Sequence, residues 1–128
     1  MRINNEDILE IDGVRIEPDM GASFNLKPIY LGHIADFSIQ LIFSGSPVGS
    51  FKLQASNDAG RISANSEPNQ YAAVTNWTDI LGSSQSITAS GDHTWTGKGA
   101  GYLWVRVVYT RVSGTGTLTS ARSNLKGV

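Results

Sequence analysis

The segment GYLWVRVVYTRV, Gly101–Val112, decides the fold class, because apolar residues recur along it at every second position. Its apolar face consists of Leu103, Val105, Val107 and Tyr109. Its opposite face mixes aromatic, charged and apolar side chains and consists of Tyr102, Trp104, Arg106, Val108 and Thr110. A period of two places successive side chains on opposite faces of a β-strand, so the segment predicts a strand that covers a core with one face.

Shorter stretches with the same period lie along the rest of the chain, separated by residues that favour turns. They predict strands within Ile8–Glu17, Ser23–Leu31, Asp36–Phe43, Ser50–Ser56, Tyr71–Trp77, Gln85–Ser90, His93–Gly97 and Thr115–Ser123. Asp12-Gly13 favours the left-handed torsions of a two-residue hairpin turn. Pro28 cannot donate a ladder hydrogen bond, which indicates an edge or a bulge at that position.

Two further connections, Ser44–Gly49 and Ser113-Gly114, are rich in turn-forming residues and are predicted to close hairpins. With about eight or nine strands at regular spacing, the chain is predicted to be all-β, an antiparallel β-sandwich and a jelly roll of about eight strands. The length of 128 residues predicts a single domain, residues 1–128. Residues 1–7 are polar and are candidates for a flexible N-terminal arm, and Thr115–Ser123 is a candidate for a paired edge strand.

The composition argues against several classes of partner. A formal net charge of -1 gives no electrostatic reason to expect a nucleic acid or an acidic membrane as partner. No stretch approaches the roughly eighteen apolar residues of a membrane helix, and the polar start lacks the apolar core of a signal peptide. The absence of cysteine excludes a disulfide framework and a thiolate metal site. We therefore expect a protein made in a reducing cytoplasm, or one that ends in a particle assembled there.

No motif in the sequence predicts catalysis, a metal or a cofactor. His33 and His93 do not stand at a metal-ligand spacing with another histidine or a carboxylate, and no serine lies in a nucleophile elbow. The glycine-rich Thr96–Gly101 precedes a strand, whereas a phosphate loop precedes a helix, so it is interpreted as a loop. We expect a protein that is not an enzyme and carries no cofactor.

Two groups of aromatic residues are candidates for binding. If the apolar face of Gly101–Val112 fills the core, the outward face needs a cover, either from the chain itself or from another protein. Its mixture of aromatic residues around an arginine is typical of protein interfaces, so the candidate interface consists of Tyr102, Trp104, Arg106 and Val108. Trp77 and Trp95 are the alternative, as platforms for sugar rings near loop tips. The irregular stretch Asn57–Gln70 is a candidate functional loop.

Three segments resemble a group of small accessory virion proteins of tailed bacteriophages. They are GSFKLQASND (Gly49–Asp58), NWTDI (Asn76–Ile80) with SITASGDHTW (Ser86–Trp95), and the run from Gly101 to Gly127. The resemblance implies a structural role in the virion, such as capsid cement or decoration, after assembly in the host cytoplasm. It implies the major capsid protein or other virion proteins as partners, and a symmetric homo-oligomer, with a trimer favoured. No nucleic acid or membrane is expected as partner.

The pattern LQASND followed by a tryptophan is also similar to discoidin-type jelly-roll domains, although this chain lacks their terminal cysteine pair. That resemblance implies a fold more than a ligand. The alternative function is therefore a carbohydrate-binding β-sandwich module, for example one by which a virion appendage binds a glycan receptor.

Overall fold

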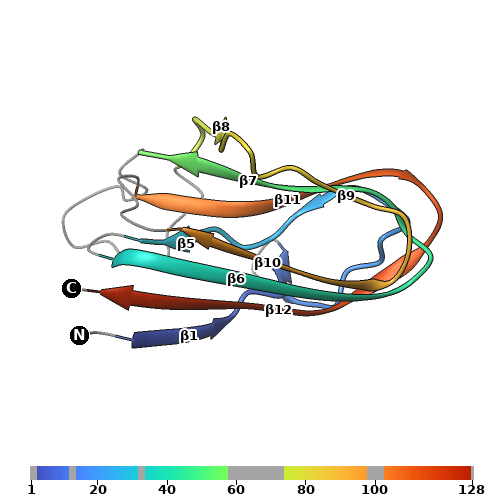
Figure 1. The fold of residues 1–128 in the computed structure, drawn as a ribbon, viewed down its shortest axis with the longest axis horizontal. Helices are drawn as coiled ribbons and strands as arrows, with labels where there is room; N and C mark the ends of the chain where they lie inside the picture. The colour runs from blue at the N-terminus through green and yellow to red at the C-terminus, as the bar shows by residue number, and fades with distance from the viewer. Residues whose placement is uncertain (1–2, 12–13, 32–33, 58–73, 98–102, 128) are drawn as a thin grey trace.

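The protein is a β-sandwich in which two antiparallel sheets enclose one hydrophobic core (Figure 1). The computed structural model describes residues 3–11, 14–31, 34–57, 74–97 and 103–127. Within these ranges the regular structure is strand throughout, and there is no helix that could cross a membrane. The predicted all-β class and the sandwich are confirmed.

Each sheet is built around two long strands. The first sheet has the order β1 (Ile3–Asp7), β12 (Gly116–Gly127), β6 (Ile34–Gly45) and β10 (Gly91–Gly97). In the second sheet, β11 (Trp104–Ser113) pairs with β7 (Val48–Ser56). The far side of β11 carries β4 (Phe24–Asn25) and β5 (Ile29–Tyr30), and the far side of β7 carries β8 (Thr78–Asp79) and β9 (Gln85–Ile87). A separate hairpin joins β2 (Glu10–Ile11) to β3 (Val14–Arg15), as Asp12-Gly13 predicts.

The order of the strands is that of a jelly roll. β4 and β5 form one edge, which is interrupted between Asn25 and Ile29 where Pro28 lies, and β8 and β9 form the other. If each of these edges is counted as one strand and the separate hairpin of β2 and β3 is left out, eight strands follow one another along the described chain. Numbered in that sequence, they have the orders 1-8-3-6 and 2-7-4-5 in the two sheets. Two interleaved Greek keys of this kind define the jelly roll, so the predicted jelly roll of about eight strands is confirmed as well.

The inward residues of both sheets meet in the core. On β11 these are Val105, Val107 and Tyr109, which the alternation predicted and which are at most 1% exposed. Phe51 of β7 is fully buried, and its ring lies 4.9 Å from that of Tyr109 and 5.5 Å from that of Phe43 on β6, measured between centroids. Phe51 therefore connects the two sheets.

Strand β12 explains why the alternation of Thr115–Ser123 is weak. Its register with β6 shifts between Leu118 and Ser120, so that the buried positions change from even to odd numbers after this bulge. Leu118 is followed in the core by Ala121, Ser123 and Leu125. A bulge adds one residue to a strand and reverses the faces beyond it, so a strict period of two is lost.

Two predicted hairpins are wrong. The turn after Gly45 leads from β6 in the first sheet to β7 in the second, and the turn at Gly114 leads from β11 back to β12 in the first. The two turns pack against each other, since the Ser46 amide donates to the Thr115 carbonyl at 2.8 Å. We call this pair of turns the crossover corner. Both connections bend the chain from one sheet to the other and leave the joined strands unpaired with each other.

Three smaller predictions are also corrected. Ile3–Asp7, within the segment considered as a flexible arm, forms an edge strand on β12, with Ile3 opposite Lys126. The closing strand β12 lies between β1 and β6 and is not an edge. The predicted strand Tyr71–Trp77 falls partly outside the described residues, and residues 74–77 have no regular structure.

Candidate protein-binding surface

The outer surface of the second sheet carries the polar and aromatic residues of the candidate interface. The positions that face outward are Trp104, Arg106, Val108 and Thr110 on β11, and Ser50, Lys52, Gln54 and Ser56 on β7, although Trp104 and Ser56 are buried. The antiparallel register places Arg106 opposite Gln54 and Val108 opposite Lys52. Because opposed residues share a face, these side chains are neighbours on one surface.

Arg106 is held on this surface by one amide and one aromatic ring. Its Nε and Nη2 both donate to Oε1 of Gln54, at 2.9 and 2.7 Å, and its Cζ lies 4.3 Å from the ring centroid of Trp77. Burial lowers the pKa of Arg106 from its usual value, although an arginine remains protonated at neutral pH. No carboxylate of the described residues forms an ion pair with it. The guanidinium is thus partly desolvated, and within the described part of the chain its charge is compensated by an amide dipole and a ring.

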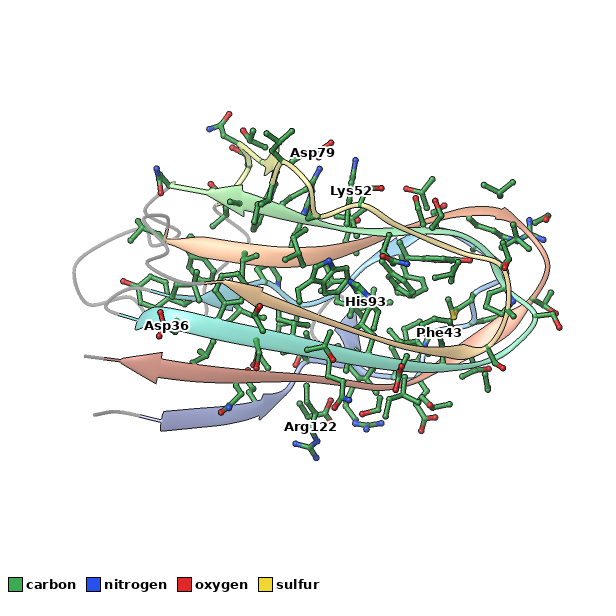
Figure 2. The ribbon with its side chains drawn as sticks, viewed as in Figure 1. Asp36, Phe43, Lys52, Asp79, His93 and Arg122 are labelled. Atoms are coloured by element: carbon green, nitrogen blue, oxygen red, sulfur yellow. The ribbon has the colours of Figure 1, made fainter. Side chains whose placement is uncertain are left out.

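The network continues from Gln54 to the edge of the sheet. Nε2 of Gln54 donates to Oδ1 of Asp79 at 2.8 Å, and Nζ of Lys52 donates to Oδ2 of the same carboxylate at 3.0 Å. Hydrogen bonds from Gln54 and then from Lys52 lower the pKa of Asp79. Figure 2 shows Lys52 and Asp79 along β7 and β8 on one side of the molecule. Asp79 therefore orients Gln54 and forms no direct ion pair with Arg106.

Trp104 is on the predicted face but is not accessible. It is fully buried, with its ring 4.9 Å from that of Tyr30 on the neighbouring edge strand β5. Its Nε1 has no hydrogen-bond partner. The chain itself covers Trp104, which was one of the two alternatives open from the sequence. Tyr102 lies outside the described residues, so Arg106 and Val108 are the members of the predicted interface that the structure leaves partly exposed.

The two candidate glycan platforms are placed differently. Trp95 is only 8% exposed, belongs to the core cluster, and donates from Nε1 to the carbonyl of Ser83 at 2.9 Å. Its ring cannot stack on a sugar, so the expectation that Trp95 lies at an exposed tip is corrected. Trp77 is half-buried, with one face towards Arg106, and donates from Nε1 to Val74 at 3.3 Å. A glycan on Trp77 remains a prediction.

The remaining candidates from the sequence are a metal site, His33 and the two loops Asn57–Gln70 and Thr96–Gly101. Among the described residues, no three His, Cys, Asp or Glu side chains are grouped as a metal site would require. His33 lies outside the described residues, as do 58–73 of the candidate functional loop and most of Thr96–Gly101.

We expect His93 to make the stability of the protein depend on pH. Its ring packs edge-on against Trp95 with centroids 4.6 Å apart, and burial lowers the pKa of His93, opposed by Asp92. Because the folded pKa is lower than the unfolded one, the unfolded state binds the extra proton, and stability falls as pH decreases through about 6.5. Thermal melts between about pH 8 and 5.5 should therefore show a declining midpoint, above the range in which carboxylates titrate.

His93→Gln is expected to flatten this profile. An unaltered decline in the His93→Gln variant would show that another group is responsible.

Three polar residues of the network were not recognised in the sequence. Lys52 and Gln54 occupy the outward positions of a strand that was predicted with Phe51 and Leu53 inward, so alternation alone could have placed them here. Asp79 is 25 residues from Gln54 along the chain, and no sequence pattern indicates that pairing.

Comparison with solved structures finds a similar fold in a prophage-derived protein. The crystal structure of SPBc2 prophage-derived protein YomS matches 97% of this chain and 92% of its own, with a TM-score of 0.53 and 16% sequence identity. At that identity the similarity establishes the fold alone. No family model and no curated protein matches the chain.

Proposed function

We propose that this chain is a non-enzymatic structural protein of a bacteriophage particle. It binds the major capsid protein or another virion protein, as capsid cement or decoration or as a neck or tail accessory, and does so as a symmetric homo-oligomer. Two observations support a phage context: the fold is shared with a prophage-derived protein over nearly the whole of both chains, and the motif order resembles accessory virion proteins. The proposed location is the virion, after assembly in the host cytoplasm.

The observation that carries the binding role is that Arg106 has no carboxylate partner among the described residues. A guanidinium has five N–H donors, and within the described part of the chain two of those on Arg106 are used, both on one oxygen of Gln54. A carboxylate from a partner would satisfy the remaining donors in a bidentate, charge-assisted pair. Trp77 on one face of the guanidinium limits its motion, so less entropy is lost when the partner binds.

The neighbouring residues fit the periphery of such a contact. Val108 offers an apolar side chain beside Arg106 for contact with a partner. Lys52, paired with Asp79, places polar groups at the rim of this surface. Arginine and aromatic residues at the centre with polar residues around them are the usual composition of a protein interface.

Co-sedimentation with purified capsids, tails and whole particles tests the proposal. Wild-type protein should pellet with one of these, and Arg106→Gln should weaken binding by tenfold or more, which corresponds to about 1.4 kcal/mol. Arg122→Gln is the matched control, because Arg122 belongs to β12 of the other sheet and lies on the opposite side of the molecule from Asp79 in Figure 2.

Equal loss in both variants would contradict the assignment of this surface, and a wild-type protein that pellets with none of the particles would contradict the function. If a glycan array then gave a signal that Trp77→Ala abolished, the carbohydrate-binding alternative would replace it.

A further inference from the structure

The outer edge of β10 is not paired with any strand of the described residues. β10 pairs with β6 at seven consecutive positions from Gly91 to Gly97 without a register shift, and it is the last strand of the first sheet. No described residue donates to or accepts from the backbone of β10 on its other side. A straight strand with free N–H and C=O groups along one edge is a template for one more strand.

The other edges of the two sheets are protected in ways that β10 is not. On the second sheet the edge strands have two or three residues, and Pro28 interrupts one of them. On the first sheet β1 is charged, with Glu6 and Asp7 bridged to Lys27 and Arg15 at 2.6 and 3.0 Å. Short strands, proline and edge charges all discourage pairing with another chain. β10 has no proline, lysine or arginine, and its single charged residue is Asp92.

We propose that β10 is a homodimer contact, in which it pairs antiparallel with β10 of a second copy. The contact would join the two four-stranded first sheets into one continuous sheet across a twofold axis. Antiparallel pairing of a strand with its own copy is isologous, so it closes after two subunits and does not extend into a filament. This inference rests on the symmetric homo-oligomer of the proposed function and names its contact, which lies on the first sheet and does not involve Arg106.

The sequence of β10 is complementary to itself in a register centred on Thr94. Thr94 then faces Thr94 of the partner subunit, and His93 faces the partner's Trp95. At the ends, Asp92 faces the partner's Thr96, so that no like charges are opposed. Pairs of threonines across strands stabilise a sheet, and β-branched side chains favour the extended backbone. Asp92, Thr94 and Thr96 are exposed, so the outward face of the joined strands remains polar and solvated.

The contact leaves the candidate interface uncovered. The outer surface of the second sheet belongs to the other layer of the sandwich, so Arg106 and Val108 remain accessible in the dimer. The dimer would present two copies of that surface and bind a lattice with higher avidity than one copy. A twofold contact also gives an even-numbered assembly, in place of the trimer favoured from the sequence.

Light scattering coupled to size-exclusion chromatography tests the dimer. The wild-type chain has a mass of 13.7 kDa and should elute at twice that value, with dissociation on dilution. Thr94→Lys places two ammonium groups opposite each other at the twofold axis and should give a monomer. Because Thr94 is exposed, we expect its thermal unfolding as a monomer to be cooperative.

Thr119→Lys is the matched control, since Thr119 is an exposed threonine on β12, an inner strand of the same sheet, and the variant should remain a dimer. A wild-type protein that is monomeric at its highest soluble concentration overturns the proposal, as does a trimer, or a dimer that Thr94→Lys leaves intact. A monomer would also contradict the homo-oligomer of the proposed function, whereas a trimer, or a dimer that Thr94→Lys leaves intact, would overturn this contact alone. Particle binding is measured by co-sedimentation, so it and this contact can fail separately.

Discussion

Replacing Phe51 by alanine is expected to lower the free energy of unfolding by about 4 kcal/mol, because it removes the ring that joins the two sheets. Phe51 is fully buried on β7, with its ring centroid 4.9 Å from Tyr109, 5.5 Å from Phe43 and 6.4 Å from Trp95. The substitution loses the transfer free energy of the ring and leaves a cavity that aromatic neighbours from both sheets cannot readily fill.

Urea unfolding followed by tryptophan fluorescence measures this loss. Phe51→Leu keeps most of the apolar volume and should cost less than half as much. Phe24→Ala is the matched control, since Phe24 stacks on the other side of Tyr109 but is only half-buried on the two-residue strand β4. If Phe51→Ala cost no more than Phe24→Ala, the central role of Phe51 in the core would be wrong.

Gly114→Ala is expected to destabilise the protein by about 3 kcal/mol or more, through backbone strain and a collision together. Gly114 has φ of 73° in the crossover corner, and a Cβ there would lie 2.2 Å from the carbonyl oxygen of Ser46. That oxygen belongs to the backbone of the adjacent turn and cannot rotate away. To relieve this collision, the two turns of the crossover corner must move apart.

Gly82→Ala separates the two causes. Gly82 has a similar φ of 80°, yet nothing lies within 4 Å of its Cβ position, so the variant reports strain alone, about 1 kcal/mol. The difference between the two variants in urea unfolding measures the collision. Equal losses would mean that the crossover corner can move apart without cost.

Alternation predicted which side chains face the core but not which strands are paired. Val105, Val107 and Tyr109 are inward as the period of two requires, because burial of one face is a local property of a strand. The turns near Gly45 and Gly114 reverse the chain in the way hairpin turns do. Whether the strands on either side form hydrogen bonds or cross between sheets depends on the packing of the whole core, which no turn residue encodes.

For the candidate interface too, the direction of the side chains was predictable from the sequence, but their contacts were not. The outward direction of Arg106 follows from its strand, whereas its contacts with Gln54 and Trp77 join three distant parts of the chain. Trp95 was misplaced because aromatic rings suit both cores and sugar platforms, and the burial of this ring, with its indole hydrogen bond to Ser83, is evident only in the tertiary structure. Trp104 was expected to need a cover, and the identity of that cover, Tyr30 on an edge strand, depends on the tertiary fold.

The pairing of β1 with β12 has a kinetic consequence. Ile3 is opposite Lys126, so the first sheet cannot be completed until nearly the whole described chain has been synthesised. Contacts of such long sequence separation require closure of a large loop before they contribute free energy, and proteins rich in them fold in milliseconds to seconds. During synthesis, the edge of β6 that pairs with β12 stays exposed until β12 has been made. The nascent chain is therefore most prone to aggregation just before its last strand emerges.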